Sequence, residues 1–166
     1  MRKNIWDPLG IKNITFWVDQ HPEMEARLAS LTVRDAESGR VVPFTQPFIN
    51  DGTKDCLGGQ GAYADLTEYL KILQSILKDD EKILKKETTA LMFQPQLTKE
   101  SKAAQKAIMN IPAVAQMFVG DFSTSIEYDW GLGGILVENE NEGRRKESTL
   151  IWSGMPNLFW VSPSAA

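Results

Sequence analysis

The sequence predicts an α+β fold in which a helical region precedes antiparallel strands. Two observations carry this prediction. Residues 65–109 hold three segments with helical spacing or composition, and residues 126–162 hold three apolar segments typical of strands. The length of 166 residues fits one domain. We expect a mainly helical region over residues 1–120 and the strands over residues 121–166.

Composition narrows the class of protein. Hydrophobic residues make up 42% and charged residues 24%, as in globular domains. The net charge is −4 without a basic stripe, which argues against nucleic acid as a partner. Cys56 and His21 are the only residues of their types, so a zinc cluster is excluded by count. No apolar run reaches membrane-span length. We expect a soluble, cytoplasmic protein without a cofactor or membrane contact.

The first 61 residues alternate short elements with a loop. Residues 2–6 resemble the end of a helix, which indicates either a missing upstream segment or a short N-terminal turn. Residues 14–18 favour a short strand, and Pro22 suits the first turn of a helix that follows. Residues 35–61 are rich in Gly and Pro and predict a long irregular loop. Such loops tend to face ligands.

The clearest helix runs from Asp65 to Lys78. Asp65 and Glu68 form a capping-box pattern at its start. Its apolar stripe consists of Leu66, Tyr69, Leu70, Leu73, Ile76 and Leu77. These residues recur at steps of three and four, so we expect one face of this helix to pack on the core.

Two more helices precede the strands. Residues 86–93 form one that ends before Pro95, residues 99–109 form another behind a Thr98 cap, and a short turn begins at Pro112. Residues 126–138 then read as one strand.

A turn at residues 139–143 leads to strands at residues 148–152 and 157–162. Trp130, Trp152 and Trp160 make these strands so apolar that at least one sheet face must be covered. The chain ends soon after residue 162, so the sequence offers no later element to cover the sheet. Together with the helix end at residues 2–6, this predicts truncation at both ends.

Two glycine clusters are candidate phosphate sites. Gly131 to Gly134 lack the following helix of a dinucleotide loop, so a packed or bulged strand is favoured. Gly58 to Gly61 could bind an anion on backbone amides, but they lack the Lys-Ser/Thr pair of a phosphate loop. A tight turn is favoured there, and either interpretation places this loop close to another group.

Possible nucleophiles are also weak on sequence grounds. Ser75 and Lys78 match a Ser-x-x-Lys pair, but they lie in the last turn of a helix, where the dipole disfavours an alkoxide. We therefore judge them a decoy. His21 fits a helix entry better than a triad, and Cys56 shows no activating pattern. The stretch from Trp152 to Asn157 fits either a hairpin or half of an oxyanion hole.

Six segments, in this order, resemble the serine β-lactamase-like family: Asp7-Pro8-Leu9-Gly10-Ile11-Lys12-Asn13, Arg27-Leu28-Ala29-Ser30-Leu31, Gly58-Gly59-Gln60-Gly61-Ala62-Tyr63, Tyr128-Asp129-Trp130-Gly131-Leu132-Gly133-Gly134, Gly143-Arg144-Arg145-Lys146 and Trp152-Ser153-Gly154-Met155-Pro156-Asn157-Leu158-Phe159-Trp160. The most similar branch contains class C β-lactamases, fungal esterases and lovastatin-type transesterases of secondary metabolism. The resemblance covers nearly the whole chain and implies a partial β-lactamase/transpeptidase-like fold.

The resemblance implies a site with three motifs, of which one is matched. Trp152-Ser153-Gly154 corresponds to the third motif, and the amide of Met155 to an oxyanion donor. Gly59, Tyr63, Trp130 and Asn157 are implied as pocket lining. The Ser-x-x-Lys nucleophile and the Tyr base belong upstream of Pro8, so this sequence contains neither.

The resemblance therefore implies the C-terminal part of an enzyme that transfers or hydrolyses acyl groups of small-molecule esters or thioesters. We expect little or no activity from the chain alone. Two alternatives stay open: a non-catalytic module that binds another chain or itself through an exposed sheet, and a degenerate or mis-called gene product.

Overall fold

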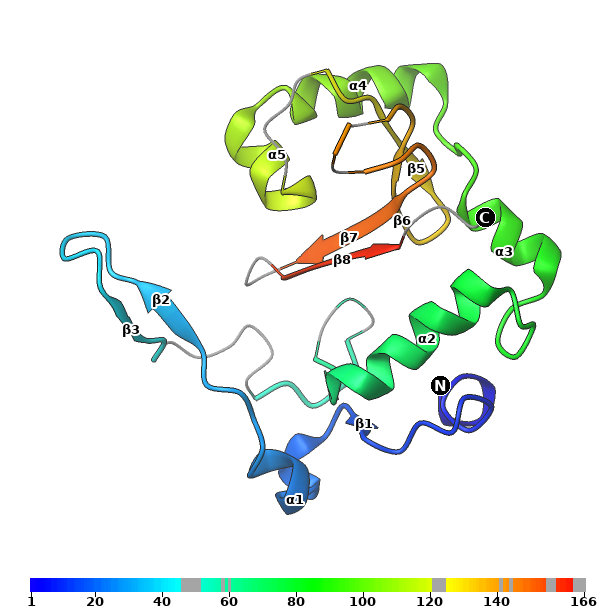
Figure 1. Ribbon diagram of the computed structural model, residues 1–166. Helices are drawn as coiled ribbons and strands as arrows, with labels where there is room; N and C mark the ends of the chain where they lie inside the picture. The colour runs from blue at the N-terminus through cyan, green and yellow to red at the C-terminus, as the bar shows by residue number, and fades with distance from the viewer. Residues whose placement is uncertain are drawn as a thin grey trace. The chain divides into compact units, whose positions relative to one another are not determined.

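The computed structural model describes residues 1–45, 52–57, 59, 61–120, 125–140, 142–143, 145–154 and 158–162. The chain divides into two compact units (Figure 1). Unit 1 comprises Met1–Leu9 and Lys71–Ala166, and unit 2 comprises Gly10–Leu70. Helix α2 (Leu66–Lys78) begins in unit 2 and continues in unit 1.

Unit 2 is built from short elements. Strands β1 (Ile14–Thr15) and β4 (Tyr63–Ala64) pair antiparallel, and so do β2 (Thr32–Arg34) and β3 (Val41–Pro43). The expected loop over residues 35–61 thus contains a strand. Helix α1 spans only Pro22–Glu25, and Leu28, which follows it, is 47% exposed. Without a buried apolar face beyond Met24, a longer helix lacks the packing that stabilises helices.

The start of α2 is held by the carboxylates of Asp65 and Glu68, the two residues of the predicted capping box. The Asp65 carboxylate accepts a hydrogen bond from Asn13 Nδ2 at 2.7 Å and one from the Arg27 guanidinium at 3.0 Å. Glu68 Oε2 accepts one from the Lys12 amide at 2.8 Å. Both carboxylates therefore hold the chain around residues 12 and 13 onto the helix, which the local sequence pattern did not indicate.

Unit 1 combines helices with a four-stranded antiparallel sheet. A 3₁₀ helix at Arg2–Asn4 and helices α3 (Lys86–Met92), α4 (Lys99–Met109) and α5 (Pro112–Val119) accompany strands β5 (Tyr128–Gly131), β6 (Gly134–Val137), β7 (Leu150–Gly154) and β8 (Leu158–Ser162). The strands lie in the order β5-β6-β7-β8. Helix α4 contacts α5 and β5, and α5 contacts β7 (Figure 1). The α+β prediction is confirmed.

Two predictions for unit 1 were wrong. Pro112 begins a helix rather than a turn, and Ala115 and Val119 of that helix are buried in the core. Residues 126–138 form a hairpin rather than one strand. Gly133 makes its turn possible, because the φ of +107° there is a conformation that L side chains rarely adopt.

The core of unit 1 lies between α5 and the sheet. Val119, Ile135, Val137 and Ile151 are each 0–1% exposed and form one cluster with Ala115 and Tyr128. Successive strand residues point to opposite sheet faces, yet Leu136 and Leu150 are also buried, at 2% and 1% exposed. Strand β6 is therefore covered on both faces, whereas β7 is open to solvent at Trp152, which is 41% exposed. This agrees with the prediction that at least one face of the sheet is covered.

Candidate functional site

The third-motif residues form the end of β7. Residues 152 to 154 pair with residues 160 to 158 of β8, in antiparallel register. Trp152 is 41% exposed, and the Ser153 hydroxyl donates a hydrogen bond to the Phe118 carbonyl at 2.8 Å. This bond ties the strand to helix α5. Met155 and Asn157, which the sequence placed at the site, lie outside the described residues.

Trp130 and Trp152 come together across the sheet. Their ring centroids lie 6.0 Å apart at an interplanar angle of 80°, the edge-to-face arrangement that aromatic pairs favour. The two residues are far apart in sequence, on β5 and β7, with β6 between those strands. They form an aromatic pair beside the third motif, with the Trp152 ring partly open to solvent.

Asp129 precedes Trp130 in β5 and is only 2% exposed. Its Oδ1 accepts hydrogen bonds from the amides of Trp130 at 2.7 Å, Gln96 at 3.0 Å and Leu97 at 3.1 Å. Burial raises the pKa of this carboxyl, but the three amide donors and the Lys102 ammonium together outweigh burial, so the net pKa is lowered. The sequence analysis missed this residue.

Lys102 of α4 connects two carboxylates of the sheet. Its Nζ lies 3.7 Å from Asp129 Oδ2 and also forms an ion pair with Glu138, just after β6. The hydrogen bond with Glu138 raises the pKa of Lys102 and outweighs the opposing effect of burial. Because Lys102 is partly buried, the ammonium joins α4 to the β5–β6 hairpin in an environment that solvent screens only in part.

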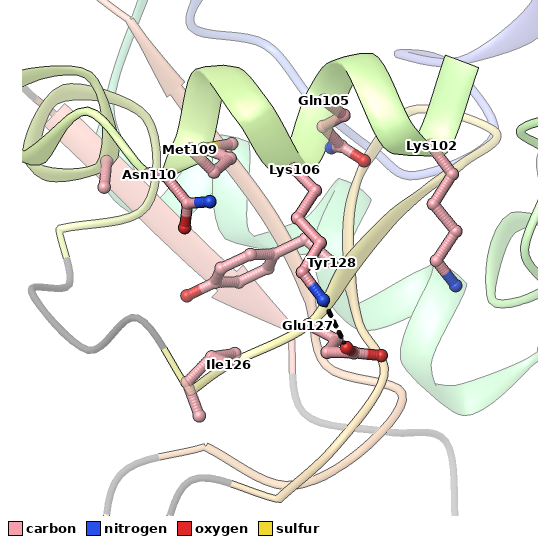
Figure 2. A pocket seen from close by; sticks show the side chains of 9 residues that line it. Lys102, Gln105, Lys106, Met109, Asn110, Ile126, Glu127 and Tyr128 are labelled. Carbon is pink, nitrogen blue, oxygen red and sulfur yellow. Dashed lines mark hydrogen bonds and ion pairs between the residues drawn. The ribbon is translucent and has the colours of Figure 1, made fainter. Parts of the chain in front are cut away.

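A small cavity of about 60 Å³ lies between α4 and the start of β5. Figure 2 shows the residues that line it, with the Lys106–Glu127 ion pair of 2.8 Å drawn as a dashed line. The Lys106 hydrogen bond lowers the pKa of Glu127. Both amide atoms of Gln105 are buried there, without a hydrogen-bond partner in the described part of the chain. No sequence pattern indicated this cavity.

Unit 2 contains an open groove of about 600 Å³. Tyr63, one of the implied pocket residues, lines it together with Phe16, Trp17 and Leu57. Asp19, Lys54 and Asp55 add charge to the groove. Gly59, the other implied residue of this unit, has no atom within 4 Å of the position that a Cβ would take. The structure thus places Tyr63 in a groove and leaves Gly59 beside open space.

Comparisons with known proteins agree with this geometry. No family model matches the chain. It is 35% identical to ML-236A carboxylate methylbutanoyltransferase of Penicillium citrinum over 96% of this chain and 38% of the relative. It is 33% identical to lovastatin esterase of Penicillium rubens over 96% of this chain and 40% of the relative.

The solved structure of simvastatin synthase (LovD) from Aspergillus terreus matches 98% of this chain and 39% of that protein, with a TM-score of 0.86 and 33% identity. The chain is a homologue of the C-terminal portion of LovD-type acyltransferases and has a partial β-lactamase-like fold. The hydrolase EstCE1 shares the fold, with a TM-score of 0.62 at 20% identity. This β-lactamase-like chain spans about 40% of the length of the curated relatives it matches, in their C-terminal portion.

The serine of the Ser-x-x-Lys pair formed by Ser75 and Lys78 is buried in this β-lactamase-like chain. Ser75 is 4% exposed, and its hydroxyl donates a 2.6 Å hydrogen bond to Asp80 Oδ1. This bond lowers the pKa of Asp80. A serine that donates to a carboxylate anchors the helix end, and the rejection of Ser75 and Lys78 as catalytic groups stays a prediction.

The residues that the structure describes contain no candidate metal site and no candidate membrane-spanning helix. Among them, no group of three His, Cys, Asp or Glu side chains is arranged to hold a metal ion. None of the helices found in the described part of the chain has the length and apolar character that a membrane crossing requires. Cys56 is a free, exposed thiol.

Proposed function

We propose that the chain is the C-terminal part of a serine acyltransferase or esterase, and that the end of β7 forms one wall of its acyl site. The match of 96–99% of the chain to fungal acyltransferases carries this proposal. Those relatives are named for transfer of a methylbutanoyl group to ML-236A carboxylate or monacolin J acid, and another is a lovastatin esterase. The substrate proposed here is likewise a small-molecule ester or thioester.

In this proposal the chain supplies binding and oxyanion stabilisation rather than the nucleophile. A serine outside this sequence attacks the acyl carbonyl while its base takes the serine proton and passes it to the departing alcohol or thiol. The amide of Met155, directly after β7, donates one hydrogen bond to the oxyanion that forms. Trp130 and Trp152 contact the acyl group. Removing one oxyanion donor typically lowers kcat by about 100- to 1,000-fold.

A chimera tests the proposal directly. The C-terminal 38% of the Penicillium citrinum transferase is replaced by this sequence, and hydrolysis of a butanoyl ester and labelling by a fluorophosphonate are measured. The chimera should react with both, whereas the 166-residue chain alone should react with neither. Met155→Pro removes the amide donor and should lower kcat by about 100-fold or more, while Met155→Leu keeps the amide and the rate. A folded chimera that takes no label contradicts the proposal.

A second candidate function, binding of another chain or self-association, is favoured by the apolar surface of unit 1. The exposed large apolar residues of unit 1 are Met1, Leu91, Ile108, Ile111, Met117, Phe118, Leu132 and Trp152. Exposed apolar surface is typical of interaction sites when it is contiguous. Size-exclusion chromatography with light scattering should then give a mass above 18.6 kDa. A monomer with a sharp thermal transition contradicts this candidate.

We also propose a cytoplasmic location. The lone, exposed Cys56 suits a reducing compartment, where a free thiol is not oxidised to a disulfide. Fractionation of cells that express a tagged chain tests the location, and recovery of the tag in the secreted fraction contradicts it.

A further inference from the structure

One oxygen atom, Asp129 Oδ1, holds two segments of unit 1 together. Two of its three amide donors, Gln96 and Leu97, belong to the connection between α3 and α4. The third donor is the amide of Trp130 in β5, at 2.7 Å. The mechanism proposed above gives this buried carboxylate no role.

The backbone of Trp130 is held on both sides by this arrangement. Its amide donates to Asp129 Oδ1, and its carbonyl accepts a hydrogen bond from the Gln96 amide at 3.0 Å. The Gln96 amide is thus shared between the Trp130 carbonyl and the Asp129 carboxylate. A charged acceptor makes shorter and stronger bonds to amides than a neutral one does, so ionised Asp129 fixes the course of β5 at Trp130.

The fixed backbone determines where the Trp130 ring meets Trp152. The T-shaped contact depends on the ring positions, because edge-to-face pairs lose their favourable geometry when one ring tilts or shifts. We propose that Asp129 is a positioning residue that holds Trp130 against Trp152 in the aromatic wall of the acyl site. The role in the acyl site rests on the proposed function. The hydrogen bonds of Asp129 and the contact between the two rings do not depend on it.

Asp129 could instead serve folding alone, and the two roles predict different spectra. Two coupled indoles give an exciton couplet in far-ultraviolet circular dichroism, and the difference between wild type and Trp152→Phe isolates the couplet of this pair. A role in folding alone leaves the couplet unchanged in any variant that still folds. A positioning role reduces the couplet when the amide acceptor is weakened.

The test uses the whole chain with Asp129→Asn, whose neutral oxygen is a weaker acceptor of nearly the same shape. We expect the couplet and the hydrogen-exchange protection of the Gln96, Leu97 and Trp130 amides to fall together. Asp129→Ala should lower both further where it folds, with the Gln96 amide retaining part of its protection through the Trp130 carbonyl. Loss of protection with an unchanged couplet overturns the inference, and so does a variant in which neither quantity changes.

Lys102→Met is the matched control. It removes the cation 3.7 Å from Oδ2 but leaves the three amides on Oδ1, so the couplet should persist. In the chimera described above, Asp129→Asn should raise KM for the butanoyl ester with little change in kcat, because the wall binds the acyl group in ground and transition states alike. An unchanged KM beside a lost couplet overturns the positioning role, whereas an inactive wild-type chimera overturns the proposed function alone.

Discussion

At the scale of single residues, Gly131 stands where β5 passes closest to helix α3. A Cβ added there would lie 2.1 Å from the Met92 carbonyl oxygen, a distance at which backbone must shift. Overpacking of this kind costs about 1–3 kcal/mol or more, so Gly131→Ala should lower Tm by roughly 2–12 °C. Gly59→Ala is the control, since its Cβ meets open space. Equal melting temperatures by circular dichroism would contradict the packing described here.

Asp129 makes a second residue-scale prediction, on acid stability. Its pKa is lowered in the folded chain, so its contribution is fully present above the unfolded pKa of about 3.9 and is lost as pH falls through the folded pKa. The free energy of unfolding of wild type should therefore exceed that of Asp129→Asn at neutral pH, and the difference should shrink below about pH 4. Urea titrations across this range check the sign, and a difference that grows on acidification would contradict it.

At the scale of elements, helix α4 buries a polar side chain, that of Gln105. Both of its amide atoms are buried beside the cavity in Figure 2, and they find no partner in the described ranges. A buried unpaired polar group costs about 1–3 kcal/mol, so Gln105→Met should raise Tm by about 2–4 °C or more. Gln116→Met, on the exposed side of α5, should change little. A destabilised Gln105→Met would show that bound water satisfies the amide.

Elements with strong local signals were predictable. The Thr98 cap of α4 accepts a hydrogen bond from the Ser101 amide at 3.3 Å, as predicted. Helix α2 also forms, but the prediction that its apolar stripe packs on the core was wrong: Leu66 is 72% and Leu70 41% exposed. Helical spacing indicates an apolar face but does not say what covers it. Helix α5 was missed because Ala, Val, Met and Phe occupy nearly every position, which leaves little polar contrast to mark a helical period. The hairpin turn was missed because the glycines between Gly131 and Gly134 were read as packing within one strand.

At the scale of the whole molecule, the aromatic pair depends on strand order that no local pattern encodes. Trp130 and Trp152 meet only because β5, β6 and β7 pair in sequence. The family resemblance pointed to both residues, since it carries information on the assembled site. It included Asp129 in a matched segment but implied no role for it, because its neighbours in space, Gln96 and Leu97, lie more than thirty residues away along the chain.

Stability should be distributed unevenly over the chain. All residues of β2 and β3 are exposed, and an isolated two-stranded hairpin is marginally stable in water. Strand β6, in contrast, is buried along its whole length. Hydrogen exchange followed by mass spectrometry should show rapid exchange in peptides that cover β2 and β3, and slow exchange in those that cover β6 and β7.

The same measurement at increasing protein concentration provides the control. Opening of an uncovered hairpin does not depend on concentration, so its exchange rate should stay constant while the core of β6 and β7 stays protected. Slow exchange in β2 and β3 that strengthens with concentration would mean that a second copy covers Val33, Val41 and Val42, which are exposed in this chain. That outcome would contradict the prediction and place self-association on the hairpin rather than on the apolar surface of unit 1.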